Sequence, residues 1–570
     1  MVSDKPGTEE PSTGNQKRRL LMRKIKVSGL LLVFVVAIAV VAMFGYTSAD
    51  AKKSTPQHSS SDAETCYACH EQIKGMHAGG KHARVACTTC HESLDKHLAD
   101  PGARPATKMD LATCGKCHKE QYESFVEVNL ESKAKVEKAS FRSRSPLFDK
   151  LLAPHGFTKE HAEPRSHVFM LVDHLIVDRG YGGRFQLKDW TKINSAKEAE
   201  KSAWSVLIDK DPTSSDQKVF IPQSATAANP VCFQCKTMDM ILDWKYMGDK
   251  DPRAKWDRTS KVVDFARSMQ HPANCFMCHD PHSTQPRVTR DALINAVVDR
   301  GEGTYPYDKE KSKQITMTKV MFRDFRAIGI LNKKDSTLRC AQCHVEYNCN
   351  PGHNPETGEA ITMADRRTNL IQWVNVFDYN KAMTEKYKFK DFKHAVTGAS
   401  LNKLQHPETE TFWMSKHERA GVECKDCHMP QVKKGNKTYT WHGQRSSRYM
   451  LKDTCTKCHT YWSPKDAEYQ VDAIQNYVKG KITKAEFWLG QLIDTFAEAK
   501  KAGVSEDVLK DVRKMHDQAH IYWEWWTAEN SDGFHNPEAA RESLTRSIDL
   551  SQKGIKTLNE AMAPKPTAAK

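Results

Sequence analysis

Eight CxxC motifs constrain the fold of this 570-residue chain more than any other feature. Seven of them continue into histidine: Cys66, Cys69 and His70; Cys87, Cys90 and His91; Cys114, Cys117 and His118; Cys275, Cys278 and His279; Cys340, Cys343 and His344; Cys424, Cys427 and His428; and Cys455, Cys458 and His459. In CxxCH both thiols attach a c-type haem, and the histidine becomes the proximal iron ligand. Redox and zinc sites also use CxxC, but they do not explain the repeated histidine. The sequence therefore predicts a multihaem cytochrome c.

The eighth motif, Cys232-Phe-Gln-Cys235-Lys236, ends in lysine. The eight motifs use all but one of the 17 cysteines and predict eight haem c groups; the cysteine left over is Cys349. An iron with histidine on both sides is coordinatively full and can only pass electrons. A single amine-ligated haem therefore suggests the place where substrate binds iron, while the alternative is an ordinary electron-transfer haem whose histidine was replaced.

Composition and charge agree with a haem-filled interior. The hydrophobic content of 39% is low for a globular chain of this length, and the macrocycles would supply the missing apolar mass. The net charge of +15 would be offset largely by haem propionates. Beyond the N-terminus, lysine and arginine are scattered, so we expect no nucleic-acid partner.

An export signal is expected at the N-terminus. A basic stretch precedes an apolar run from Val27 to Tyr46, and Ala49-Asp50-Ala51 follows. The segment is either a signal peptide cleaved after Ala51 or an uncleaved membrane anchor. Both interpretations place the remaining chain outside the cytoplasmic membrane, in the periplasm or its equivalent.

The distribution of motifs divides the chain. Residues 1–51 form the signal or anchor, 52–150 an N-terminal three-haem domain, 151–465 a catalytic five-haem domain and 466–570 a C-terminal helical region. The fold class is mainly α, with loops and short helices wrapped round the haems and long C-terminal helices. Leu489, Leu492, Ile493 and Phe496 recur at helical spacing, and a last helix is predicted to begin at Asn536-Pro537.

Histidines beyond the proximal seven are abundant enough to supply distal ligands, since the chain has 25 in all. His77, His82 and His97 lie among the first three motifs and are the obvious candidates there. The alternative for His77 and His82 is an ordinary surface position.

Several further segments resemble a known family. The region from about 160 to 545 is similar to the ammonia-forming pentahaem cytochrome c nitrite reductases, and the whole chain resembles the octahaem nitrite reductases. The similar segments are Cys232–Lys236, Pro164-Arg165-Ser166-His167 with Arg179 after it, Cys340 to Glu346-Tyr347, and Lys403-Leu-Gln405-His406-Pro-Glu. The resemblance implies that His167, His417, His442 and His535 are distal ligands, the last of them in the C-terminal region.

The resemblance implies a substrate pocket over the Lys236 haem, lined by Arg179, Tyr347 and His406. The chemistry is suitable: a fixed cation holds the nitrite anion, histidine donates protons near neutral pH, and a phenol donates a hydrogen bond. A Ca²⁺ ion is implied as well. Its ligands would be the Glu346 and Gln405 side chains and the Tyr347 and Lys403 carbonyls.

Cys349 departs from the pentahaem pattern, because it stands two residues after Tyr347. Residues i and i+2 of an extended segment share a face, so a Tyr347–Cys349 thioether is sterically allowed; a free buried thiol is the alternative.

Three functions compete. The first is six-electron reduction of nitrite to ammonium, fed by seven bis-histidine haems and by a quinol-linked or periplasmic cytochrome donor. The second is the octahaem hydroxylamine oxidoreductase or sulfite reductase branch, and the third a non-catalytic electron-transfer protein. The lysine-ended motif together with the Arg, Tyr and His set favours the first. A homo-oligomer is expected by analogy.

Overall fold

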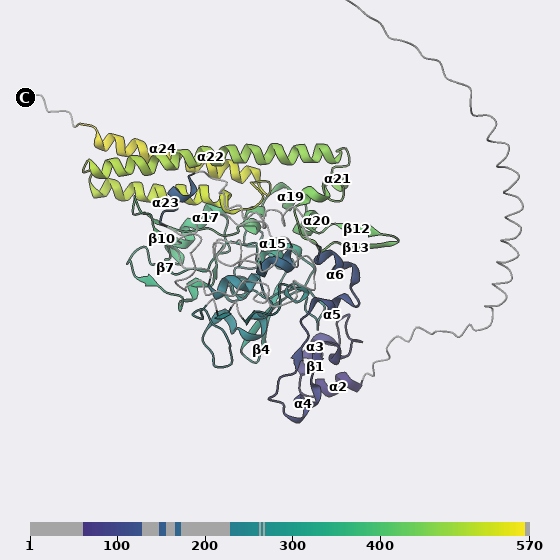
Figure 1. Cartoon of the computed structure of the whole chain (residues 1–570). Helices are drawn as coiled ribbons and strands as arrows, with labels where there is room; N and C mark the ends of the chain where they lie inside the picture. Colours follow the sequence, from purple (N-terminus) through teal and green to yellow (C-terminus); the bar gives the residue numbers. More distant parts are fainter. Residues whose placement is uncertain are drawn as a thin grey trace, which may run out of the picture. The chain divides into compact units, whose positions relative to one another are not determined.

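The structure is a computed structural model and describes residues 61–127, 147–154, 166–172, 229–261, 264–265 and 268–564 (Figure 1). The residues described from Ser61 onward belong to one compact unit. The predicted export segment and Arg179 lie outside the described residues. Within the part that is described, no helix is both long and apolar enough to cross a bilayer. The predicted boundaries at residues 150 and 465 stay predictions.

The N-terminal part consists of short elements, several of which contain residues of a haem motif or begin directly after one. They are α2 (Ser61–Tyr67), α3 (Glu71–His77), the 3₁₀ helix η1 (Cys87–Thr89), β1 (His91–Glu92), α4 (Leu94–Ala99), β2 (Ala106–Thr107), α5 (Leu111–Gly115) and α6 (Lys119–Phe125). His70 and His118 occupy the N-cap positions of α3 and α6. Few apolar side chains are buried here, Leu111 among them, as expected where haems supply the core.

The central part contains a sheet that the sequence did not reveal. Strands β3 (Arg287–Val288), β4 (Met317–Phe322) and β5 (Arg326–Leu331) pair antiparallel in the order β3-β5-β4. Arg323 and Asp324 turn the β4–β5 hairpin with positive φ angles of 53° each. Helix α14 (Asp291–Ile294) follows β3 at once, and its four residues are all buried. The sheet thereby fixes the segment between β3 and α14 inside the core.

The other elements of this part are short. They are α8 (Phe148–Leu151), η2 (His167–Phe169), η3 (Pro230–Cys235), α12 (Met240–Asp243), η4 (Tyr246–Gly248), η5 (Cys275–Met277), the π-helix η6 (Asn295–Asp299), α15 (Lys309–Gln314), α16 (Ser336–Ala341), β6 (Tyr347–Asn348), β7 (Gly352–His353), β8 (Ala360–Ile361), η7 (Arg366–Thr368), β9 (Leu370–Ile371), α17 (Val376–Lys381), the π-helix η8 (Ala382–Lys386), β10 (Phe392–Lys393), β11 (Ser400–Leu401), α18 (Glu408–Phe412), α19 (Lys416–Arg419), α20 (Cys424–His428), β12 (Gln431–Lys434), β13 (Lys437–Thr440), η9 (Ser447–Met450) and α21 (Cys455–Cys458).

Three long helices form the C-terminal part, α22 (Pro464–Lys501), α23 (Glu506–Ala528) and α24 (Pro537–Met562), and they lie side by side in Figure 1. Leu489, Leu492, Ile493 and Phe496 are fully buried, which confirms the predicted apolar stripe. Asn536 caps α24 as predicted. Gly554 allows α24 to approach α22 closely, because a Cβ atom there would lie 2.7 Å from Leu492 Cδ1.

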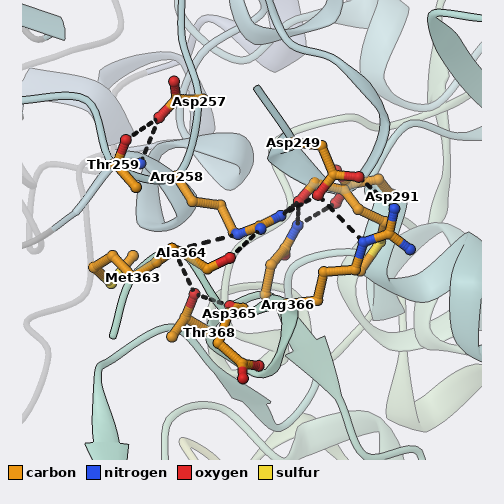
Figure 2. Close-up of polar contacts among 12 residues, drawn as sticks. Asp249, Asp257, Arg258, Thr259, Asp291, Met363, Ala364, Asp365, Arg366 and Thr368 are labelled. Atoms are coloured by element: carbon orange, nitrogen blue, oxygen red, sulfur yellow. Dashed lines mark hydrogen bonds and ion pairs between the residues drawn. The ribbon is translucent and has the colours of Figure 1, made fainter. Parts of the chain in front are cut away.

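A set of polar contacts, called the polar clamp below, joins the loop after η4 to the segment before β9 (Figure 2). The Arg258 guanidinium donates to Asp249 Oδ1 (2.8 Å) and to the Ala364 carbonyl (2.6 Å). Arg366 reaches the same Asp249 carboxylate from the other side. At the start of α14, Asp291 Oδ1 accepts a hydrogen bond from Asn369 Nδ2 at 2.9 Å. The clamp therefore fixes η4, η7 and the start of α14 against one another.

Candidate haem-binding sites and catalytic centre

Each CxxCH motif is arranged by the turn that it forms. The histidine N–H donates to the carbonyl of the first cysteine in five motifs, at 2.9 Å for His70, His118 and His459, 3.0 Å for His279 and 2.8 Å for His344. This bond brings both thiols and the imidazole to one side of the turn. The lysine-ended motif differs, because the Lys236 N–H donates to the Phe233 carbonyl at 2.8 Å.

Every proximal histidine faces a second imidazole. Two imidazole nitrogens about 2.0 Å from one metal place the ring centroids roughly 6 Å apart. The observed centroid separations run from 5.9 to 6.5 Å, and the pairs are His70 with His97, His91 with His282, His118 with His82, His279 with His442, His344 with His167, His428 with His535, and His459 with His417. The residues thus fit one iron per pair.

His77 does not follow the sequence-based expectation. It faces Tyr67 across the α2–α3 contact, with its Nδ1 2.6 Å from the phenol oxygen. The position opposite His91 is taken by His282, whose ring is nearly parallel to that of His91 at 8°. The sequence reasoning missed His282 although it stands in the His279-Asp-Pro-His282 segment, because nothing local distinguishes a distal ligand from a neighbour.

Hydrogen bonds to Nδ1 orient several of these rings and leave Nε2 for a metal. The partners are the Ala103 carbonyl for His97 (2.8 Å), the Pro281 carbonyl for His82 (2.9 Å), the Thr440 carbonyl for His442 (2.7 Å) and the Arg445 carbonyl for His428 (3.0 Å). His535 Nδ1 lies 2.6 Å from Glu529 Oε1, at ion-pair distance. Burial lowers the pKa of His167 and of His279 to about 3. The His167 and His279 imidazoles are therefore neutral, which is the form of histidine that binds a metal.

Neighbouring motifs touch through their cysteines. The thiols of Cys114 and Cys275, of Cys235 and Cys343, and of Cys340 and Cys424 lie close enough to shift each other's pKa. The third N-terminal motif thus adjoins the first histidine-ended motif of the central part, and the lysine-ended motif adjoins Cys340–His344. The Asn274 Nδ2 group, which donates to the Met109 carbonyl at 2.7 Å, ties the two parts together at the same place.

The lysine-ended motif is held in a buried 3₁₀ turn. Asn229 caps η3 by accepting from the Val231 N–H at 3.0 Å, and Pro230 begins the helix. The thiol of Cys232 donates to Cys349 Sγ at 3.4 Å. Cys349 is buried; its thioether with Tyr347 stays a prediction.

Tyr347 and His406 lie together, as the resemblance implies. Tyr347 stands on β6, opposite Ile371 of β9, and its ring centroid is 6.1 Å from that of His406 at an angle of 28°. The Gln405 N–H donates to Glu346 Oε2 at 2.6 Å, so the residues before Tyr347 and His406 are bonded to each other. Arg179, the third expected member, lies outside the described residues.

Buried carboxylates surround the predicted calcium ligands. Glu346 Oε1, Asp391 Oδ1 and Glu410 Oε2 are buried without a hydrogen-bond partner among the described residues. Within that part, no three His, Cys, Asp or Glu side chains are arranged to hold a metal. A cation would therefore need the Tyr347 and Lys403 carbonyls and the Gln405 amide as well, which suits Ca²⁺. Burial raises the pKa of Asp391 to about 7; the sequence did not point to Asp391 or Glu410.

Glu524 of α23 anchors the segment that carries His406. Its Oε1 lies 2.7 Å from Lys403 Nζ and accepts from the Leu404 N–H at 3.2 Å, and its Oε2 lies 2.8 Å from His520 Nε2. Lys403 and Glu524 side chains are at most 1% exposed. Burial alone would raise the pKa of Glu524, but the Lys403 ammonium and His520 lower it to about 2.

Glu524→Gln is expected to lower the free energy of unfolding by about 3–5 kcal/mol, because it removes the carboxylate that faces the buried Lys403 ammonium. Denaturant unfolding of the haem-loaded protein measures the loss. Glu538→Gln is the control, since its exposed pair with Lys416 is worth less than about 1 kcal/mol. The Glu524 contribution should be fully present above the ordinary pKa of 4.5 and fade as the pH falls towards 2; equal losses in both variants would contradict it.

Comparison with known proteins identifies the relatives of this chain. The cytochrome c552 family matches residues 204–570. A cytochrome c-552 of Parabacteroides distasonis is 29% identical over 336 residues, 58% of this chain and 57% of that protein. The cytochrome c nitrite reductase subunit NrfA of Nitratidesulfovibrio vulgaris is 26% identical over 464 residues, 77% of this chain and 74% of that protein.

Among solved structures, the catalytic subunit NrfA of the Desulfovibrio desulfuricans cytochrome c nitrite reductase, described with two calcium sites, superposes with a TM-score of 0.53. It is 21% identical, and the match covers 79% of this chain and 86% of that one, so the likeness concerns the fold. The chain spans less than two thirds of several of its cytochrome c-552 relatives. The family match covers more than half of the chain, and the chain belongs to the cytochrome c552 family.

Proposed function

We propose that the protein reduces nitrite to ammonium at a haem attached to Cys232 and Cys235 and ligated by Lys236. The observation that carries the proposal is the pair formed by Tyr347 and His406 beside the one motif that ends in lysine. The seven other motifs each offer two facing imidazoles, which suits electron transfer. The NrfA relatives are named nitrite reductases, which supports the assignment.

Each pocket residue has a separate task. Nitrite takes up six electrons and eight protons and gives ammonium and two water molecules; the haem, when bound, supplies the electrons and an iron ligand position. His406 donates protons and is protonated again from solvent. Tyr347 donates a hydrogen bond from its phenol, and Arg179 holds the negative charge of nitrite. Glu346, Tyr347, Lys403 and Gln405 would hold a Ca²⁺ ion, which would fix the two catalytic segments against each other.

The cysteine contacts suggest an electron route. With haems bound, electrons from the N-terminal motifs would pass from the Cys114 site to the Cys275 site, because the two thiols lie close together. The route continues to Cys340–His344 and ends at the lysine-ended motif, where Cys343 meets Cys235. We propose eight haems in total, a quinol-linked or cytochrome donor outside the cytoplasmic membrane, a homo-oligomeric protein and no nucleic-acid partner.

Steady-state turnover with a chemical reductant tests the function, with nitrite, hydroxylamine and sulfite as separate substrates and ammonium quantified. The expected result is one ammonium per nitrite at a rate well above that with sulfite. Faster oxidation of hydroxylamine, or faster reduction of sulfite, would assign the protein to the other enzymatic branch. No turnover combined with an entirely low-spin haem spectrum would leave an electron-transfer protein.

A further inference from the structure

Arg290 is a buried cation that the proposed reaction does not yet use. It is 2% exposed and stands at the N-cap of α14, directly after β3. The backbone on its N-terminal side is held in place, because the preceding Thr289 N–H donates to Gln342 Oε1 at 3.0 Å. Gln342 lies between the two cysteines of the Cys340–His344 motif. The backbone next to Arg290 is thus bonded to the Cys340–His344 motif.

Arg290 touches both parts of the proposed catalytic centre. Its Cζ lies 4.8 Å from the centre of the Tyr347 ring, in cation–π geometry. Its Nη1 lies 3.1 Å from Cys235 Sγ and 3.4 Å from the Val231 carbonyl. One guanidinium therefore packs on the catalytic tyrosine and on the edge of the lysine-ended motif.

The charge of Arg290 is not balanced by an ion pair with any described carboxylate. Its Nε and Nη2 groups are buried and have no hydrogen-bond partner among the described residues. The adjacent Asp291 is engaged elsewhere, accepting from Trp244 at 2.8 Å and from Asn369 at 2.9 Å. Arg287, by contrast, is paired with Asp280 at 2.9 Å. Burying an unpaired cation is costly, so its presence beside a haem motif calls for a compensating role.

We propose that Arg290 is a positioning and electrostatic residue of the catalytic centre, which orients Tyr347 and raises the reduction potential of the Lys236-ligated haem. A nearby positive charge favours the ferrous form over the ferric form, because the ferrous haem carries one positive charge fewer. The effect is large where water is excluded. This inference rests on the proposed function only in taking that haem as the catalytic one.

Spectroelectrochemical titration of the haem-loaded protein tests the proposal. The high-spin signal isolates the Lys236 haem, and the low-spin bis-histidine haems serve as internal references. Arg290→Met is expected to lower the midpoint potential of the high-spin haem alone and to lower kcat for nitrite about tenfold. Arg290→Lys should restore most of the potential. Arg326→Met is the matched control, because this buried arginine donates to the Met240 and Trp244 carbonyls.

Comparison of the variants separates the effect of the Arg290 charge from the effect of its packing. Arg290→Gln keeps two donors without the charge, so it should behave like Arg290→Met; it also serves if the Met variant does not accumulate. A high-spin potential that is the same in the unmodified, Gln and Met proteins would overturn the role of Arg290 and leave the proposed function intact. An unmodified protein with only low-spin haem would overturn both.

Discussion

Replacing His406 with asparagine is expected to lower kcat for nitrite by about 100- to 10,000-fold, the usual contribution of a positioned proton donor. Reduction of nitrite consumes protons at the pocket, and His406 is the described side chain beside Tyr347 that can deliver them. Asparagine keeps a polar group of similar size but cannot transfer a proton at neutral pH. Stopped-flow or steady-state assays with a chemical reductant measure the loss.

His353→Asn is the control for His406→Asn. His353 is also partly buried in the central part, where its Nε2 lies 2.9 Å from the Ser400 hydroxyl, and it faces none of the proximal histidines described. Its variant should keep kcat within about twofold. The haem spectra of both variants should match the unmodified protein, since neither residue is a proposed iron ligand. A His406→Asn enzyme with nearly full kcat would remove His406 from the mechanism.

Replacing His282 with alanine is expected to convert one haem from low spin to high spin and to block reduction of the catalytic haem through the N-terminal motifs. The reason is that His282 faces His91 at 6.2 Å between ring centroids and would leave the iron with five ligands. Electron paramagnetic resonance of the oxidised protein counts the change. Added imidazole should restore the low-spin signal.

His77→Ala is the decisive comparison for His282→Ala. Both histidines are near the N-terminal motifs, but His77 is bonded to Tyr67. The His77 variant should therefore keep every low-spin haem. High-spin haem in the His77 variant only would contradict this prediction. It would show that His77, which the sequence suggested, is the iron ligand and that His282 is not.

The sequence predicted what is local and missed what is assembled from distant segments. A CxxCH motif would supply both thioethers and one iron ligand within five residues, so these sites could be proposed from local sequence alone. The second ligand comes from wherever the chain returns, and six of the seven expected residues lie opposite a proximal histidine. His77 was preferred because it is close in sequence, which the iron does not require.

The acidic residues behind the pocket were missed for the same reason. Glu524 belongs to α23, where Trp523, Trp525 and Trp526 are buried around it. Its partner Lys403 is far away in the sequence, so periodicity alone could not show the pair. The short β4–β5 hairpin was missed because its strands lack a clear alternation of apolar and polar residues. Only the folded chain shows that these segments meet.

The pairing of His91 with His282 also has a consequence for biogenesis. Under the proposed export, the segment after the apolar run would cross the membrane before the central part of the chain, so the Cys87–His91 motif would be exported before His282. A haem attached to this motif would obtain its second imidazole only after the segment with His282 had crossed. The backbone at Gly80 lies close to the same segment, since a Cβ atom there would lie 2.4 Å from the His282 carbonyl. A larger residue at this position would obstruct the approach of His282. Of the three N-terminal motifs, the Cys87–His91 motif would therefore depend on the later segment for its second imidazole, whereas His70 faces His97 and His118 faces His82.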